Sequence, residues 1–289
     1  MTFSTVVKNK PMIDKLLICT DLDRTLIPNG PQPESPQGMP LFHNLVSRPG
    51  IELAYVTGRD KKLVMDVIEQ FNLPIPDYAI MDVGATIYDI QSNQWRRRID
   101  WDQKISGDWR NKSHRDLALL LADLDQCQLQ EEEKQGFHKL SYYVPLKIHP
   151  GALMDDIQLR MKHHGIQANT IWSIDEQKKT GLLDILPAGA NKRKAIDFLI
   201  KTQSFDHTNT VFSGDSGNDL SVLVSPIKSI LVGNASPELK SEVRKQVDMK
   251  DASAHLYIAR GGYSNMNGNY VAGILEGINH YFPELKLQD

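Results

Sequence analysis

Short apolar runs alternate with stretches of helical period along the first third of the chain. Residues 16–20, 53–56 and 78–81 are compact apolar runs that each end in polar residues. After the second run, apolar residues recur at helical spacing behind Asp60, which we expect to be the N-cap of a helix. Alternation of strand and helix is typical of a parallel sheet with helices on both faces.

The same alternation resumes after residue 188. Apolar runs at residues 210–213, 229–232 and 255–258 predict further strands, with helical periodicity between and after them. The sequence therefore predicts an α/β fold with a doubly wound parallel sheet, formed by residues 1–105 and 188–289.

Residues 106–187 break the alternation. Their order is helix, strand, helix and then two strand-like runs, at residues 166–172 and 182–186. We expect this block to be an inserted α+β domain, which we call the cap. Two further segments are expected to be loops: the proline-rich residues 28–40 and the asparagine-rich residues 261–269, the latter mobile at the surface.

Composition narrows the classes of function. The chain of 289 residues has 36 Asp and Glu against 33 Lys and Arg, whereas nucleic-acid-binding proteins are usually strongly basic. A local positive pocket for a small phosphorylated substrate is compatible with this balance. The two cysteines, Cys19 and Cys127, form no CxxC pair, which argues against a zinc site or a disulfide framework. We expect a cytoplasmic protein, because no signal peptide or membrane-length apolar segment is evident.

Acidic residues follow the first predicted strand. Asp21 and Asp23 come directly after the run at residues 16–20. Ligands of open parallel sheets bind at the carboxyl ends of the strands, where segments distant in sequence can meet. One carboxylate could act as a nucleophile that forms an acyl phosphate, and the other could exchange a proton with the leaving oxygen. Taken alone, the pair is better explained as a solvated turn.

Two other segments could bind a phosphate. Thr57 and Gly58 precede a predicted helix, where a hydroxyl and a backbone N–H form either a phosphate cradle or an ordinary N-cap turn. Lys192, Arg193 and Lys194 begin another predicted helix. One of these cations could neutralise a phosphate, and at least two of them are expected to face solvent.

A third acidic segment follows the run at residues 210–213. Asp215 and Asp219 lie four positions apart among glycines and small polar residues. Hard oxygen ligands in a tight loop suit Mg²⁺, which would offset the repulsion between an attacking carboxylate and a phosphate dianion. We therefore favour a metal site over a simple turn.

In this order, DLDRT at 21–25, VTGR at 56–59, the lysine at 192 and GDSGND at 214–219 resemble the motifs of the haloacid dehalogenase (HAD) superfamily of phosphatases. The resemblance implies a Rossmann-like core with a large cap of the Cof type. Segments such as KLSYY at 139–143 and VGNASPE at 232–238 are similar to those of the sucrose-phosphate phosphatases. The likeness extends over most of the chain.

The resemblance implies catalytic roles at matching positions. Asp21 would be the nucleophile and Asp23 the general acid/base. Thr57 and the Gly58 backbone would bind phosphate, and Lys192 would be the family lysine.

The resemblance also implies a metal site. Asp21, the backbone carbonyl of Asp23 and Asp215 would hold Mg²⁺ with support from Asp219, and Asn218 would lie near the phosphate.

Two positions depart from the family pattern without removing a reacting group. Arg24 stands where Asn or Gly is commoner, and Arg193 follows the lysine where Gly is commoner. In the cap, we expect Lys139 and Tyr142 to contact the sugar. Tyr143 is a further candidate contact, but adjacent residues on a strand face opposite ways, so we expect one tyrosine of the pair to belong to the cap core.

These implications together give a specific expectation. The chain would be an Mg²⁺-dependent, monomeric phosphatase that hydrolyses a disaccharide phosphate, first of all sucrose 6-phosphate, through a phospho-aspartyl intermediate on Asp21. It would act in sucrose biosynthesis, with no nucleic-acid or membrane partner, and association with a partner glycosyl-phosphate synthase is left open. The alternatives are another glycosyl phosphate, such as mannosylfructose phosphate or a glucosyl- or mannosyl-phosphoglycerate, or a non-catalytic sugar-phosphate binding protein.

Overall fold

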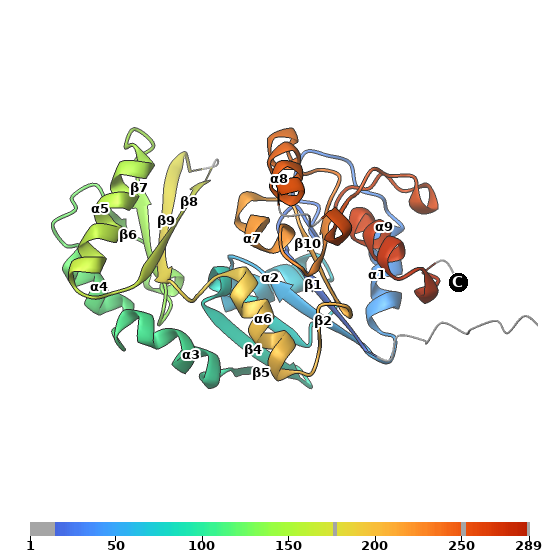
Figure 1. The fold of residues 1–289 in the computed structure, drawn as a ribbon, viewed down its shortest axis with the longest axis horizontal. Coiled ribbons are helices and arrows are strands. Elements are labelled where there is room, and N and C mark those ends of the chain that lie inside the picture. The colour runs from blue at the N-terminus through green and yellow to red at the C-terminus, as the bar shows by residue number, and fades with distance from the viewer. Residues whose placement is uncertain (1–14, 176–177, 250–252, 288–289) are drawn as a thin grey trace, which may run out of the picture.

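The computed structural model of the chain describes residues 15–175, 178–249 and 253–287, which form a large and a small β-sheet (Figure 1). The large sheet has eight strands in the order β12-β11-β10-β1-β2-β3-β4-β5. Its central strand β1 pairs in parallel with β2 and β10. The strands of this sheet are β1 (Leu16–Thr20), β2 (Ile51–Val56), β3 (Tyr78–Met81), β4 (Thr86–Gln91), β5 (Gln94–Arg97), β10 (Thr210–Gly214), β11 (Lys228–Leu231) and β12 (Leu256–Ile258).

One edge of the large sheet differs from the predicted parallel pattern. β4 pairs antiparallel with β3, and β5 pairs antiparallel with β4. Apolar runs did not predict this hairpin, because its strands are only partly buried at the end of the sheet. The sheet is therefore mostly parallel with an antiparallel edge.

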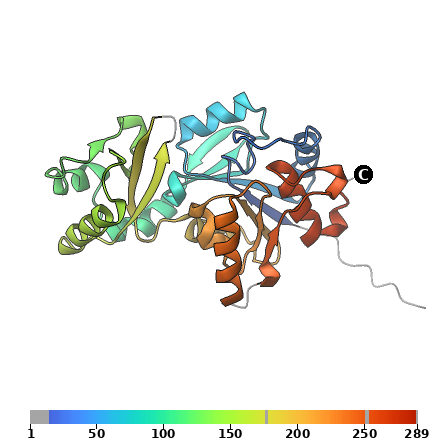
Figure 2. The same cartoon turned by 90° about the horizontal axis from the view of Figure 1, so that it is seen from above.

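Helices cover both faces of the large sheet (Figure 2). Leu16 and Ile18 of β1 point to one face and Leu17 and Cys19 to the other, because side chains alternate along a strand. The first face packs against α1 (Gly38–Val46), α2 (Lys61–Gln70) and α9 (Val271–Tyr281). The second face packs against α3 (Ile99–Ser106), α6 (Lys192–Thr202), α7 (Leu220–Leu223) and α8 (Pro237–Met249).

The small sheet belongs to the cap and lies at one end of the molecule in Figure 1. It is antiparallel, with the order β6-β7-β9-β8, and it packs against two helices around its own apolar core. All of that core lies within residues 106–187. These elements are α4 (His114–Leu120), β6 (Gln128–Leu129), β7 (Leu140–Val144), α5 (Pro150–His163), β8 (Ala168–Asp175) and β9 (Thr180–Pro187).

The proline-rich segment is shorter as a loop than expected. α1 begins at Gly38, so Pro40 lies inside the helix. A proline is tolerated in the first turn because its missing N–H would have no helical partner there. No helix among the described residues combines the length and the hydropathy needed to cross a bilayer.

The asparagine-rich segment is not the mobile loop that the sequence suggested. Asn267 Nδ2 and Asn269 Nδ2 donate to the carbonyl of Pro33 at 2.8 and 3.0 Å. The buried carboxylate of Glu276 accepts a hydrogen bond from Gly261 N at 2.9 Å. Hydrogen bonds thus connect residues 261–269 to the proline-rich loop and to α9.

Candidate active site

Three neighbouring strands bring the predicted site residues to one edge of the large sheet. Asp21 follows β1, Thr57 follows β2 and Asp215 follows β10. The order β10-β1-β2 and the parallel pairing place these strand ends side by side. Asp21 N donates to Ser213 O at 2.9 Å, and this bond holds the chain after β1 against β10.

Lys192 lies between two of the aspartates. Its Nζ is 3.0 Å from Asp21 Oδ1 and 2.7 Å from Asp219 Oδ1, and its side chain is fully buried. Arg193 instead forms an ion pair with Asp197 on the surface of α6, at 2.8 Å. Of the basic residues that open this helix, Lys192 is therefore the one at the site.

Burial and mutual charge shift the pKa values of this cluster. Burial raises the pKa of Asp21 to about 8, and the charges of Asp219 and Asp215 act in the same direction against Lys192. Burial also raises the pKa of Asp215 to about 6. Burial alone would lower the pKa of Lys192, but the charges of Asp21 and Asp219 outweigh it and raise that pKa. The environment of the cluster therefore disfavours the simultaneous ionisation of its carboxylates, and a further cation would favour it.

The carboxylates fit a divalent metal ion. Asp21, Asp215 and Asp219 are buried and offer oxygens within 4.8 Å of one another. All are hard oxygen donors, as Mg²⁺ prefers. Asp219 Oδ1 already faces Lys192, and its Oδ2 accepts from the backbone N–H groups of Asp215 and Ser216, both at 3.1 Å. Asp219 is thus placed to support the site, and Asp21 and Asp215 are the other two carboxylates that could offer oxygens to an ion.

Asp23 is held by two side chains that the sequence did not assign to it. Arg59 Nη2 donates to Asp23 Oδ1 at 2.6 Å and Arg59 Nε donates to Oδ2 at 2.7 Å, and Asn29 Nδ2 donates to Oδ1 at 2.7 Å. Burial alone would raise the pKa of Asp23, but these contacts outweigh it and hold the pKa below its ordinary value. The free protein therefore keeps Asp23 as a carboxylate.

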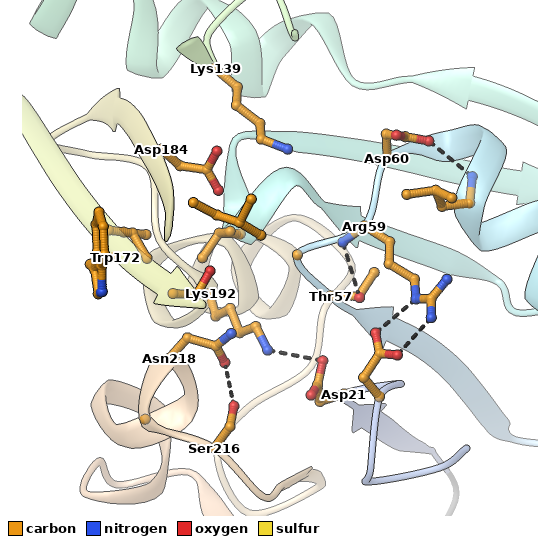
Figure 3. A pocket seen from close by; sticks show the side chains of 18 of the residues that line it. Asp21, Thr57, Arg59, Asp60, Lys139, Trp172, Asp184, Lys192, Ser216 and Asn218 are labelled. Atoms are coloured by element: carbon orange, nitrogen blue, oxygen red, sulfur yellow. Dashed lines mark hydrogen bonds and ion pairs between the residues drawn. The ribbon is translucent and has the colours of Figure 1, made fainter. Parts of the chain in front are cut away.

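A pocket of about 810 Å³ lies between the core and the cap. Figure 3 shows Asp21, Thr57 and Lys192 on the side of the core. Across from them, Lys139, Trp172 and Asp184 come from the cap. Gly58 and Asn218 also line the pocket, and Asn218 Oδ1 accepts from Ser216 Oγ at 3.0 Å. The pocket is of the size typical of small-molecule sites.

The two cap residues expected to contact sugar lie in different places. Lys139 lines the pocket, and its Nζ lies 3.4 Å from Asp82 Oδ1. Tyr142 is 3% exposed and packs in the cap core, so its expected contact with the sugar is not supported. Neither Tyr142 nor Tyr143 is among the residues that line this pocket. The expectation that one tyrosine of the pair belongs to the core is confirmed.

Sequence reasoning missed Trp172 and Asp184. Trp172 lies on β8 and Asp184 on β9, and both line the pocket. A tryptophan in an apolar strand signals a core residue as readily as a pocket wall, so no local pattern marks it. Arg59 could have been found, because it stands in the VTGR segment that leads from β2 to α2.

The chain is similar to known phosphatases over nearly its whole length. It matches the family described as Sucrose-6F-phosphate phosphohydrolase over residues 14–282. A protein of Nitrosococcus oceani named as a HAD-like hydrolase is 50% identical over 275 residues, which are 95% of this chain and 74% of that protein. Sucrose-phosphatase 1 of Nicotiana tabacum is 27% identical and covers 92% of this chain, which spans 59% of the tobacco protein.

A solved structure confirms the fold. The sucrose-phosphatase of Synechocystis, solved in complex with sucrose and phosphate, superposes with a TM-score of 0.70 at 24% identity. The superposition covers 92% of this chain and 98% of the Synechocystis chain. Given the match over residues 14–282, the chain belongs to the sucrose-6F-phosphate phosphohydrolase family and is a phosphoric monoester hydrolase of the HAD superfamily.

Proposed function

We propose that this protein is an Mg²⁺-dependent phosphatase that hydrolyses a disaccharide phosphate, with sucrose 6-phosphate as the first candidate. The observation that carries the proposal is the buried Asp21–Lys192 pair, 3.0 Å apart, at the core side of a pocket whose other side is the cap. The proposal includes a cytoplasmic location and a monomeric state. Family membership supports the reaction class, and the pocket supports a substrate larger than phosphate itself.

The first step would transfer the phosphoryl group to Asp21. A carboxylate oxygen of Asp21 attacks phosphorus, and the bond to the ester oxygen of the sugar breaks as Asp23 gives that oxygen a proton. Lys192 holds Asp21 by charge, and Thr57 and the Gly58 N–H, both at the pocket wall, would bind the incoming phosphate. Bound Mg²⁺, held by Asp21, Asp215 and the Asp23 carbonyl, would supply positive charge against the repulsion between carboxylate and phosphate.

The second step would release phosphate. Asp23, now a carboxylate, takes a proton from a water molecule whose oxygen attacks phosphorus and frees Asp21. The contacts with Arg59 favour this carboxylate form, because they lower the pKa of Asp23. To act as an acid in the first step, Asp23 must first take up a proton from solvent, so substrate binding is expected to open the Arg59–Asp23 pair and thereby raise the pKa of Asp23.

The nucleophile is tested by replacing it with its amide. Asp21→Asn should abolish phosphate release while the protein remains folded, because an amide cannot form the acyl phosphate. Asp197→Asn on α6 is the matched control, since Asp197 lies on the surface in an ion pair with Arg193 and outside the pocket. Full activity in Asp21→Asn would refute the mechanism.

The substrate is tested with a panel of phosphates at equal concentration. The panel contains sucrose 6-phosphate, mannosylfructose phosphate and the glucosyl- and mannosyl-phosphoglycerates, with and without Mg²⁺. The proposal requires the highest kcat/KM for sucrose 6-phosphate. Preference for another compound would change the substrate but not the reaction, whereas binding without Mg²⁺-dependent turnover on any of them would favour a non-catalytic binding protein.

A further inference from the structure

Arg24 places a positive charge against one carboxylate of the candidate metal site. Its Nε lies 3.3 Å from Asp215 Oδ2. The other oxygen, Asp215 Oδ1, accepts a hydrogen bond from Thr25 Oγ1 at 3.1 Å. Both oxygens of Asp215 are therefore engaged by the protein, one of them by a cation.

The backbone holds Arg24 in this place from two sides. Arg24 N donates to Asn29 Oδ1 at 2.8 Å, and its carbonyl accepts from Asn234 Nδ2 at 2.6 Å. The φ of Arg24 is +59°, in the left-handed region that a long side chain rarely adopts. The direction in which its side chain leaves the backbone is thus set by the surrounding loops.

The two cations of the cluster differ in their freedom to move. Lys192 is fully buried between Asp21 and Asp219, whereas the side chain of Arg24 is 43% exposed, and its Nε lies near Asp215 without a hydrogen-bond partner among the described residues. A metal ion that uses an oxygen of Asp215 meets the guanidinium of Arg24 at that same carboxylate. The ion must either displace the guanidinium into solvent or bind beside it against its charge.

We propose that Arg24 is an internal competitor of Mg²⁺ at Asp215, which neutralises this carboxylate in the metal-free protein and thereby weakens metal binding. The inference rests on the metal site of the proposed function, but it concerns the binding of the ion alone. It makes Arg24 a residue that sets the Mg²⁺ concentration at which the site fills.

The test is a titration of the substrate-free protein with MgCl₂, followed by calorimetry and by the rise in Tm. Arg24→Asn removes the charge with a residue that tolerates a positive φ, so the variant is expected to fold. We expect it to bind Mg²⁺ about tenfold more tightly, the order expected for one nearby charge acting on a divalent ion. Its Tm should also rise more on saturation, because the metal-free state has lost the cation that offsets Asp215.

Three variants serve as controls. Arg24→Lys keeps the charge and should bind Mg²⁺ nearly as the wild type does. Arg193→Gln removes a positive charge from the α6 surface without touching the cluster, and should also leave the affinity unchanged. Asp215→Asn added to Arg24→Asn should cancel the gain, which would locate the ion at this carboxylate.

The inference would be overturned if Arg24→Asn bound Mg²⁺ no more tightly than the wild type. It would also be overturned if Arg24→Lys gained as much Mg²⁺ affinity as Arg24→Asn, or if no variant bound Mg²⁺. The Mg²⁺-binding test of Arg24 can be decided independently of the proposed phosphatase reaction. Tighter binding by Arg24→Asn in a protein that releases no phosphate from any sugar phosphate would sustain the role of Arg24 and refute the phosphatase proposal.

Discussion

Gly84 lies so close to Asn191 that no side chain fits between them. A Cβ on Gly84 would come within 2.3 Å of the carbonyl carbon of Asn191 and 2.8 Å of Lys192 N. The φ of Gly84 is +101°, which also favours glycine. Asn191 is the N-cap of α6, and its side chain accepts from Lys194 N at 2.9 Å. The turn after β3 therefore sets the position of the helix start that delivers Lys192.

We expect Gly84→Ala to damage both stability and activity. The added methyl group must push the start of α6 away, and the positive φ adds strain, so the free energy of unfolding should fall by about 2–4 kcal/mol. The displacement of Lys192 should lower kcat as well. Urea unfolding and phosphate-release kinetics would measure the two effects.

A second glycine supplies the control for this substitution. Gly107, with φ of −60°, has no atoms within 4 Å of an added Cβ. Gly107→Ala should therefore leave stability within about 0.5 kcal/mol of the wild type. Equal effects of the two substitutions would contradict the close-approach argument.

The position of the acidic site could be predicted from the sequence, because each of its aspartates lies close behind the end of a predicted strand. Asp21 and Asp215 each follow a short apolar run, and a parallel sheet brings such ends together whatever the length of chain between them. The same reasoning placed Thr57, but it left Lys192 open among three basic neighbours, and only the resemblance to the family singled out Lys192. The structure supports that assignment by the burial of Lys192, which depends on the packing of α6 against the sheet.

Contacts made across long sequence separations were not predictable in this way. The hydrogen bond between Asn267 and Pro33 joins residues 234 positions apart. It anchors a segment that the sequence suggested would be mobile. Tyr142 was expected in the pocket, but the register of β7 against β9 turns it toward the cap core. A one-residue shift would have exchanged its place with Tyr143, and sequence alone does not determine that register.

Replacing Lys192 by methionine should destabilise the protein strongly. The change leaves Asp21 and Asp219 buried without their common cation, and breaking a buried pair in this way costs about 3–5 kcal/mol. We also expect kcat to fall at least about 100-fold, because the cation that orients Asp21, the proposed nucleophile, is lost. Chemical unfolding and initial-rate kinetics provide the measurements. Arg193→Gln is the control and should cost less than about 1 kcal/mol, since its partner Asp197 is on the surface.

Asn234 is buried and should hold in place the loop that carries Asp23, the proposed general acid. Its Nδ2 donates to the Arg24 carbonyl at 2.6 Å, and its Oδ1 accepts from Tyr270 N at 2.8 Å. Asn234→Ala leaves a donor and an acceptor unpaired, so we expect a loss of about 2–4 kcal/mol in unfolding free energy and a lower kcat. The exposed Asn44→Ala is the comparison, expected within about 0.5 kcal/mol of the wild type. A kcat unchanged in Asn234→Ala would show that the clamp does not position the loop.

His138 should make the stability of the protein depend on pH. Its ring is 2% exposed and makes edge-to-face contacts with Trp109 and Phe137, and neither ring nitrogen has a hydrogen-bond partner among the described residues. Burial lowers the pKa of His138 below its ordinary value, so the folded state binds a proton less readily than the unfolded chain does. This contribution to stability is fully present above about pH 6.5 and decreases as the pH falls below it, by up to about 1.4 kcal/mol per pH unit.

His138→Phe keeps an aromatic ring and removes the titration. We therefore expect its unfolding free energy, measured in urea between pH 7.5 and 5 at about half-unit steps, to fall less steeply than that of the wild type. Carboxylates contribute equally to both proteins, so the difference between the two curves isolates the histidine. Parallel curves would mean that His138 can take up a proton inside the fold, which its unpartnered nitrogens and apolar neighbours argue against.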